Sequence, residues 1–376
     1  MKLAGIYIHI PFCAVKCMYC DFYSIAEKED SIPRFINALN TEIERCNIDS
    51  NNWKFDTIFI GGGTPSIIEA NFLESIITSL SNKYDLSEVK EFTIEANPGE
   101  APKQRLKDYH SMGINRLSIG VQSLEPSLLK FLTRIHNKDQ FFETYKNARS
   151  VGFDNINFDL IYSIPGQSWD IWERDLNKII DLDPEHISAY TLTMEKGTDL
   201  FQMVKNGQVQ MPQDSQTGEW FTRTHEILNS NGICTYEVSN FSKAGMECQH
   251  NIHYWRIHPY LAFGPSAHGF NGSSRWNNTR SLDQYIQQIE SGKSPVSISE
   301  VLTKKDNLNE YIGFGLRMVE GIDLDEFSGT YKSDFIKNYY SAKLKWEEYF
   351  NEDQNTISLT RKGMLFSDLI IPELLL

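Results

Sequence analysis

Three cysteines, Cys13, Cys17 and Cys20, lie in one short stretch with the spacing CxxxCxxC. They follow the apolar residues 6–10 directly, which places the thiols in a loop after a predicted strand. A closed structural zinc site takes four ligands, usually as two separated pairs, and no fourth cysteine follows here at once. Three thiolates can instead hold three irons of a [4Fe–4S] cluster and leave the fourth iron open. The spacing therefore predicts a cluster, with a zinc knuckle completed by a distant His or Cys as the alternative.

Glycine and polar residues follow several other apolar runs. Gly62 and Gly63 stand in a run of three glycines before Thr64, and glycine lets backbone groups approach a ligand closely, although a plain turn needs it too. Three more polar residues end later apolar runs: Glu95, Gln122 and Asp159. Each alone is more typical of a helix cap or a rim residue. Their recurrence on successive units predicts that they converge at one face of the fold.

A second group of candidate ligands occupies residues 248–255, where Cys248, His250 and His253 alternate with aromatic residues. The stretch 264–269, which ends in His268 and a glycine, follows it. Neutral imidazole and thiolate are both axial ligands of heme iron, and aromatic rings can cover a porphyrin face. A buried structural cluster at a domain junction is the alternative from chemistry alone.

The elements that must position these residues alternate between short β-branched or aromatic runs and longer amphipathic segments. Predicted strands cover residues 5–10, 56–60, 91–95, 116–119, 155–161 and 187–192, and predicted helices cover residues 32–46, 69–82, 102–112, 139–151 and 168–182. Six such units favour an incomplete parallel (β/α) barrel over a flat doubly wound sheet, because the unusual residues fall at the ends of the strands.

The chain divides into three predicted parts. Residues 1–232 form the partial barrel, 233–298 a bridging segment, and 299–376 a small C-terminal domain. A helix over residues 215–231 and a strand over residues 234–238 are expected before the regular alternation ends. The last part should contain helices over residues 304–318 and 334–350, with small strand or helical pieces at 356–359 and 364–371.

The composition indicates a globular protein and argues against a membrane-spanning or nucleic-acid-binding one. The length of 376 residues suits a barrel with a small appendage, and 40% hydrophobic with 23% charged residues is ordinary for a globular chain. No apolar run reaches the ~20 residues of a membrane span. The net charge of −14, without a basic run, argues against nucleic acid as a partner. A reduced thiol trio and an N-terminus that leads straight into a strand predict a cytoplasmic protein, with the membrane surface as a further place of action.

Together these motifs resemble the radical SAM superfamily, in which the open iron of the cluster binds S-adenosylmethionine (SAM). Within it they resemble the family of oxygen-independent coproporphyrinogen III oxidase over nearly the whole chain. The matching stretches are residues 8–13, the cysteine loop, 61–65, 95–99 and 120–123, together with Arg134 and His136. The resemblance implies an α/β fold, an incomplete parallel (β/α)6 TIM-like barrel with a small, mainly helical, winged-helix-like C-terminal domain.

The resemblance also implies roles for individual residues. Cys13, Cys17 and Cys20 would ligate the cluster. The SAM site would contain Tyr7, Tyr19, Gly62, Gly63, Thr64, Glu95, Gln122, Arg134 and Asp159. Tyr19 can offer adenine a stacking face, Arg134 can pair with the SAM carboxylate in a fork, and the acidic residues can accept hydrogen bonds from ribose or amine.

Residues 250–255 resemble the HNxxYW motif that marks a heme chaperone group within this family. His250, Asn251, Tyr254 and Trp255 are therefore expected to contact heme, with Cys248 and His253 as reserve ligands.

Two functions follow as hypotheses, and neither assigns a catalytic residue. One is radical oxidative decarboxylation of coproporphyrinogen III; the other is a heme chaperone that passes heme to apoproteins. The chaperone is favoured because Phe22 stands where the oxidase loop has a fourth cysteine, and because Tyr7 already lies in the first strand, which leaves no N-terminal arm. Expected partners are heme or a porphyrin, heme-accepting apoproteins and a reducing electron donor such as flavodoxin, without a transmembrane segment.

Overall fold

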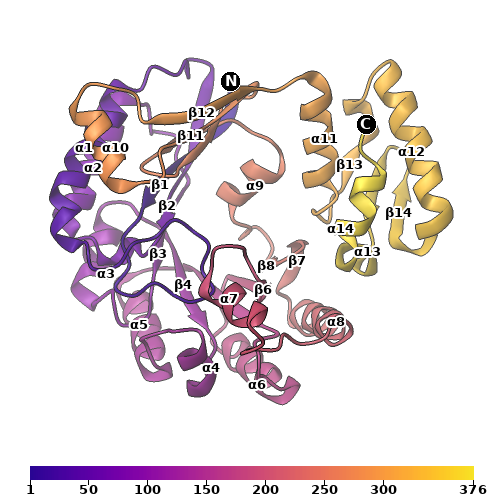
Figure 1. The fold of residues 1–376 in the computed structure, drawn as a ribbon, viewed down its shortest axis with the longest axis horizontal. Coiled ribbons are helices and arrows are strands. Elements are labelled where there is room, and N and C mark those ends of the chain that lie inside the picture. The colour runs from indigo at the N-terminus through magenta and orange to yellow at the C-terminus, as the bar shows by residue number, and fades with distance from the viewer.

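The computed structural model describes residues 1–376 and contains two sheets. The larger sheet has twelve strands in the order β12-β11-β10-β9-β1-β2-β3-β4-β5-β6-β8-β7, and the smaller has three in the order β13-β15-β14. Figure 1 shows the large sheet curved with helices outside it, and the small sheet in a separate unit at the C-terminal end.

The centre of the large sheet is the predicted incomplete barrel. Its parallel strands are β1 (Lys2–Ile10), β2 (Trp53–Gly62), β3 (Glu91–Ala96), β4 (Arg116–Gln122), β5 (Asn155–Tyr162) and β6 (His186–Thr191). The helices between them are α1 (Ile32–Arg45), α2 (Ala70–Lys83), α3 (Lys103–Ser111), α4 (Pro126–Phe131), α5 (Lys138–Val151) and α6 (Trp169–Ile180). The six predicted strands and five predicted helices are confirmed, with small shifts at their ends; α4 was not predicted.

Local sequence explains why these helices form and which face they bury. In α1, Phe35, Leu39 and Ile43 recur at helical spacing and pack into the core. The N-terminus of α5 has a capping box, in which Asn137 and Gln140 satisfy each other's backbone N–H groups. Gly152 ends the same helix in the left-handed region, with φ of 106°. The helices thus present one apolar face to the outside of the sheet.

The large sheet continues beyond the barrel on both sides, although the regular alternation of strand and helix ends near residue 238, as expected. On the β1 side it adds β9 (Tyr260–Phe263), β10 (His268–Phe270), β11 (Ser274–Asn278) and β12 (Val296–Val301), and on the β6 side β8 (Asn240–Ser242) and β7 (Cys234–Glu237). Four helices lie in the same stretch of chain: α7 (Asp199–Lys205), α8 (Asp214–Ser230), α9 (Gln249–Trp255) and α10 (Leu282–Glu290). The predicted helix at residues 215–231 and strand at residues 234–238 correspond to α8 and β7. The other added strands were not predicted, because most have only three to five residues, too few to show a period.

The C-terminal unit is small and mainly helical, as expected. It contains α11 (Lys304–Gly315), β13 (Ile322–Asp323), α12 (Thr330–Trp346), β14 (Phe350–Asp353), β15 (Thr356–Leu359), α13 (Arg361–Leu365) and α14 (Ser367–Ile370). The boundary predicted at residue 299 falls inside β12, which still pairs with β11 of the large sheet.

Backbone hydrogen bonds join the C-terminal unit to the large sheet. Val238 N–H donates to the carbonyl of Arg317, and Val319 N–H donates to the carbonyl of Tyr236, both at 3.0 Å. On the other side, Arg275 of β11 pairs with Glu310 of α11. The unit is therefore fixed at two separate places. No helix of this chain combines the length and apolar character that crossing a bilayer requires.

Candidate functional site

The cysteine loop follows β1 at the carboxyl end of the barrel. Its base is closed by Cys13 N–H, which donates to the carbonyl of Ile25 at 2.9 Å. Cys13, Cys17 and Cys20 are all free thiols and partly exposed. Burial raises the pKa of Cys13, and it raises the pKa of Cys20 to about 11. Cluster assembly must therefore displace protons from these thiols, because iron binds the thiolate.

The thiols do not close a site for a single ion. No three His, Cys, Asp or Glu side chains in this chain converge in the manner that one metal ion needs. A [4Fe–4S] cube takes one thiolate on each iron, so three cysteines on one loop fit a cluster with an open iron better than a zinc knuckle, which needs a fourth ligand.

The glycine turn after β2 packs directly against the cysteine loop. Gly63 N–H donates to the carbonyl of Ile10, and Thr64 N–H donates to the carbonyl of Phe12, both at 2.7 Å. A Cβ atom on Gly63 would lie 2.5 Å from the Phe12 carbonyl oxygen and 3.0 Å from Cys13 Sγ. Gly62 has φ of +114°, in the region that favours glycine. Glycine is therefore required at residue 62 by its backbone conformation and at residue 63 by the close approach of the cysteine loop, which a plain turn would not demand.

A chain of hydrogen bonds links two of the thiols through the site. Thr64 Oγ1 donates to Cys13 Sγ at 3.4 Å, and Asn97 Nδ2 donates to Thr64 Oγ1 at 2.9 Å. Arg134 Nη2 donates to Asn97 Oδ1 at 2.5 Å, and its Nη1 approaches Cys17 Sγ at 3.7 Å. Asn97 is not among the residues expected to line the SAM site, although its place just after β3 could have indicated a role. A shallow pocket lies here, lined by Val15, Cys17, Asn97, Glu100, Thr133, Arg134, Ile135 and His136.

Glu95 on β3 and Asp159 on β5 are half-buried carboxyl groups on the barrel wall. Glu95 Oε2 accepts a hydrogen bond from Gly62 N–H at 3.0 Å. Burial, together with the nearby Asp159, raises the pKa of Glu95 to about 8. Burial also raises the pKa of Asp159, although the hydrogen bonds that this carboxyl group accepts favour its charged form and lower the pKa. At neutral pH the Glu95 carboxyl is therefore mostly protonated in the absence of a bound cation.

Asp159 is oriented by a chain of polar side chains along the barrel interior. Ser118 Oγ and Asn157 Nδ2 each donate to it at 2.9 Å. The Asn157 carbonyl oxygen lies 2.6 Å from Nδ1 of His186, whose Nε2 lies 2.8 Å from the hydroxyl of Tyr236. Because Tyr236 can donate only its hydroxyl proton and Asn157 Oδ1 can only accept, His186 carries its proton on Nδ1 in this arrangement.

The remaining predicted SAM-site residues lie at the same end. Tyr7 donates its hydroxyl proton to His9 Nδ1 at 2.9 Å, and burial together with Glu95 raises its pKa. Tyr19 lies among Arg134, Cys17, Cys20 and Asp159, and burial raises its pKa. Gln122 is buried at the end of β4 with φ of 65°. The structure thus brings all nine predicted residues together beside the cysteine loop, while their roles toward SAM stay predictions.

The expected heme-binding motif has a different setting, because α9 lies inside the barrel across the first halves of β1–β3. The N–H groups of Gln249 and His250 donate to Glu91 at 2.8 and 3.0 Å. His250 is 1% exposed, and its two ring nitrogens lie 2.8 Å from the hydroxyls of Thr57 and Tyr254. This geometry favours the structural interpretation for His250, since neither nitrogen is free for iron.

The reserve ligands and the last residue of the motif are also engaged. Cys248 is buried against Glu91, and His253 lies 2.8 Å from Asp56 and 2.9 Å from His258. Trp255 packs edge to face on Phe314 of α11, with 6.0 Å between ring centroids. Asn251 is half-buried on the same helix. In this structure the motif therefore packs α9 into the barrel and against the C-terminal unit.

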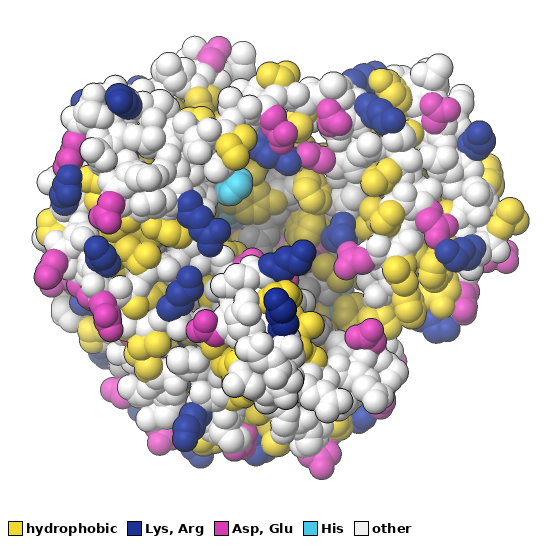
Figure 2. All heavy atoms as spheres, in the orientation of Figure 1, with side chains coloured by type: hydrophobic (Ala, Val, Ile, Leu, Met, Phe, Trp, Pro, Cys, Tyr) yellow, Lys and Arg dark blue, Asp and Glu magenta, His cyan; other side chains and the backbone are white.

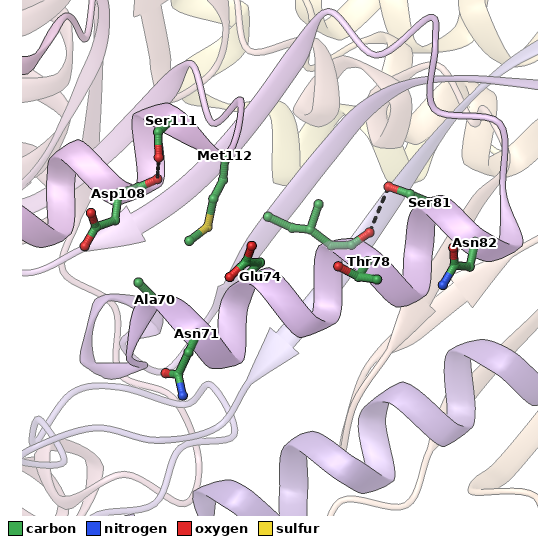
Figure 3. A pocket seen from close by; sticks show the side chains of 10 residues that line it. Ala70, Asn71, Glu74, Thr78, Ser81, Asn82, Asp108, Ser111 and Met112 are labelled. Carbon is green, nitrogen blue, oxygen red and sulfur yellow. Dashed lines mark hydrogen bonds between the residues drawn. The ribbon is translucent and has the colours of Figure 1, made fainter.

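A separate surface groove of about 600 Å³ lies between α2 and α3. Figure 3 shows its lining side chains, including Glu74 and Thr78 on α2 and Asp108 on α3. None of the predicted cofactor residues lines it, so it is not part of the site described above.

Comparison with known proteins places these features in a family. Residues 7–179 match the model of the radical SAM superfamily, and residues 302–366 match that of the HemN C-terminal domain. The heme chaperone HemW of Lactococcus lactis is 33% identical over 98% of this chain and 97% of its own length, and HemW of Bacillus subtilis is 32% identical over 96% of each.

A solved structure, the coproporphyrinogen III oxidase HemN of Escherichia coli, has a TM-score of 0.83 with this chain at 21% identity, covering 100% of this chain and 90% of that one. This likeness shows the fold. The superfamily is defined by a [4Fe–4S] cluster and SAM, which are the cofactors that membership implies and that the cysteine loop and its surroundings fit. The chain therefore belongs to the radical SAM superfamily, in the family that contains the HemW proteins and HemN.

Proposed function

We propose that this protein is a heme chaperone that binds heme, a [4Fe–4S] cluster and SAM and delivers heme to apoproteins. The observation that carries the proposal is similarity over nearly the full length of both chains to proteins named heme chaperone HemW. Phe22 supports the proposal. It is 68% exposed, and it occupies the position at which the loop of the oxidase family is expected to carry a fourth cysteine.

The residues of the cysteine loop and barrel mouth would hold the cofactors. Cys13, Cys17 and Cys20 would ligate the cluster, which when reduced supplies the electron that can cleave SAM. Arg134 has a buried guanidinium beside Cys17, where it can pair with the SAM carboxylate. Glu95 can accept a hydrogen bond from the SAM ammonium, which would favour its ionised form over the protonated one. The flavodoxin-type electron donor and the cytoplasmic location remain predictions.

For the motif on α9 we propose a supporting role in heme binding. His250, Asn251, Tyr254 and Trp255 would shape the wall of the heme site and fix the C-terminal unit beside it, because His250 is bonded at both nitrogens and Trp255 contacts Phe314.

The alternative function is oxygen-independent coproporphyrinogen III oxidation. It is kept because the fold matches HemN over the entire chain. The two functions differ in what the site must recognise: a chaperone needs a ligand for the iron of heme, whereas the oxidase substrate carries no metal.

One preparation tests both functions. The reconstituted protein is titrated with heme under anaerobic conditions and should develop a saturable, protein-bound Soret band at one heme per chain. The same preparation, given reductant, SAM and coproporphyrinogen III, should release no carbon dioxide from the propionates. Turnover to protoporphyrinogen IX would replace the chaperone assignment with the oxidase, and absence of heme binding would remove the chaperone assignment altogether.

A further inference from the structure

Three exposed apolar side chains lie next to the thiols of the cysteine loop. Val15, inside the loop, is 38% exposed, and Ile135 is 59% exposed. Both line the shallow pocket that Cys17 also lines. Phe22 is exposed two residues beyond Cys20, and its backbone N–H donates to the Cys20 thiol. We call Val15, Phe22 and Ile135 the loop patch, and none of the three belongs to the predicted cofactor site.

The turn that carries Ile135 has a strained backbone. Thr133 has φ of 59°, a left-handed conformation that β-branched residues rarely adopt. The residues on both sides of Ile135 point inward, since Arg134 donates to the carbonyl of Gly120 at 2.8 Å and His136 is buried. Backbone strain of this kind costs on the order of 1–3 kcal/mol and occurs preferentially at functional sites. The turn thus holds Arg134 toward the cofactor site and leaves Ile135 in solvent.

The loop patch lies on the side of the cysteine loop that the rest of the fold leaves open. The glycine turn at Gly63 and Thr64 covers one side of the loop. Another side is covered by α7, where Leu200 N–H donates to the carbonyl of Met18 at 2.9 Å, and Figure 1 shows α7 beside the loop. Electron transfer between proteins becomes steeply slower with distance. A carrier that reduces a cluster on this loop must therefore approach from the open side.

The size of the loop patch fits a transient partner better than a permanent one. Three side chains cover a small area, and electron-transfer encounters bury less than about 1,200 Å², whereas obligate dimers bury about 2,000 Å² or more. The face drawn in Figure 2 likewise shows apolar side chains in separate groups among polar and charged ones.

The charge beside the loop patch indicates the kind of partner. Lys16, next to Val15, is exposed and is the one charged residue between Cys13 and Cys20, in a chain whose net charge is −14. A positive charge at this place attracts an acidic protein and steers its approach toward the thiols.

We propose that the loop patch, together with Lys16, is the docking surface for a small acidic one-electron carrier protein of the flavodoxin type. The proposal rests on the proposed function, because it needs a [4Fe–4S] cluster on the three cysteines. The carrier loses one electron and the oxidised cluster gains it, and no bond forms or breaks. Phe22 is then an aromatic anchor for the carrier, the kind of side chain that contributes most to protein interfaces.

Anaerobic stopped-flow reduction of the reconstituted protein tests the apolar part of this surface. Mixing with reduced flavodoxin bleaches the cluster absorbance and gives a second-order rate constant. The double variant Phe22→Ser, Ile135→Ser should lower this constant by about tenfold, because docking contacts are lost. Dithionite needs no docking surface and should reduce the double variant as fast as the original chain. Leu344→Ser, at a nearly fully exposed position on α12, is the control and should leave both rates unchanged.

The charge at Lys16 is tested separately. Lys16→Glu should lower the rate constant with flavodoxin severalfold at low salt, and high salt should shrink this difference, because salt screens the attraction. Lys107→Glu, exposed on α3, changes the net charge by the same amount and should have little effect. Calorimetric titration with oxidised flavodoxin, which transfers no electron, should show weaker binding to the double variant than to the original chain.

The outcomes separate this proposal from the proposed function. If the reconstituted chain holds no cluster, the proposed function fails. If dithionite reduces the cluster but flavodoxin does not, or if flavodoxin reduces the double variant at the original rate, the docking surface is wrong while the function stands. Equal slowing with dithionite and flavodoxin would show damage to the cluster and overturn the docking assignment. A dimer of the original chain that the double variant does not form, seen by sedimentation, would make the loop patch a contact between copies instead.

Discussion

At the scale of single residues, Asn97 connects the parts of the cofactor site. It bridges Thr64, which donates to one thiol, and Arg134, which approaches another. The Asn97 amide can serve both because it offers a donor and an acceptor at once. Side chains that orient ligands from behind often contribute as much to affinity as the ligands themselves.

Substitution of Asn97 should therefore weaken SAM binding without any loss of direct contact to the cluster. We expect Asn97→Leu to bind SAM about 10- to 100-fold more weakly, by analogy with other residues that orient ligands. Asn97→Asp keeps an acceptor for Arg134 and should retain most of the affinity. Calorimetric titration of the reconstituted protein with SAM measures both, with Asn82→Ala on the exposed side of α2 as the control. Equal affinities for the Leu variant and the original chain would show that Arg134 needs no such support.

That the cysteines, Gly62 and Gly63 lie together could be anticipated because their chemistry or spacing is unusual in any fold. The hydrogen bonds of His250 to Thr57 and Tyr254 could not be predicted in this way, because Thr57 is distant in the sequence and meets His250 only in the folded chain.

At the scale of elements, Glu42 joins α1 to the added strands. Its carboxyl group accepts hydrogen bonds from Tyr285 at 2.5 Å, Gly264 N–H at 2.9 Å and Asn278 at 2.6 Å. These partners belong to α10, the end of β9 and β11. Burial nevertheless raises the pKa of Glu42 to about 7, because the three donors do not fully offset desolvation.

This raised pKa makes stability depend on pH in a definite direction. The unfolded carboxyl titrates near about 4.3, so between that pH and about 7 the folded chain binds more protons than the unfolded chain. The contribution of Glu42 is full below this window and falls by on the order of 4 kcal/mol as the pH rises through it. Glu42→Gln should remove that part of the pH dependence in urea unfolding, whereas Glu44→Gln, exposed on the same helix, should leave it in place. If the free energy of unfolding changed with pH in the same way in the original chain and in both variants, Glu42 would not be the source of this pH dependence.

Among the elements, the barrel strands and their helices were predictable because each is long enough to show its own period. The helix α9 was not, because its sequence QHNIHYW is polar yet buried. A polar helix fits inside this barrel only because Glu91 and Thr57 already make the lumen polar. That match between two distant stretches cannot be read from either one alone.

At the scale of the whole molecule, the C-terminal unit is attached through several small contacts. Trp255 on Phe314 is the aromatic one, beside the Arg275–Glu310 ion pair and the backbone bonds at Val238 and Val319. Aromatic pairs of this geometry contribute beyond the area they bury.

Removing the indole should loosen the unit while the barrel stays folded. We expect Trp255→Ala to be cut faster by protease in the connection at residues 302–303, because the unit opens more often when the contact is lost. Tyr340→Ala, 61% exposed on α12, is the control and should be cut at the original rate. Identical cutting rates for Trp255→Ala and the original chain would mean that the other contacts suffice.

The position of α9 also bears on the order in which SAM and heme could bind. It lies across the first halves of the strands inside the barrel, so ligands of the cofactor site enter and leave through the mouth at the other end. If heme sits there, it covers the route by which SAM comes and goes. SAM would then load first and stay trapped until the heme has left, and the rate of SAM exchange would reveal whether heme is bound.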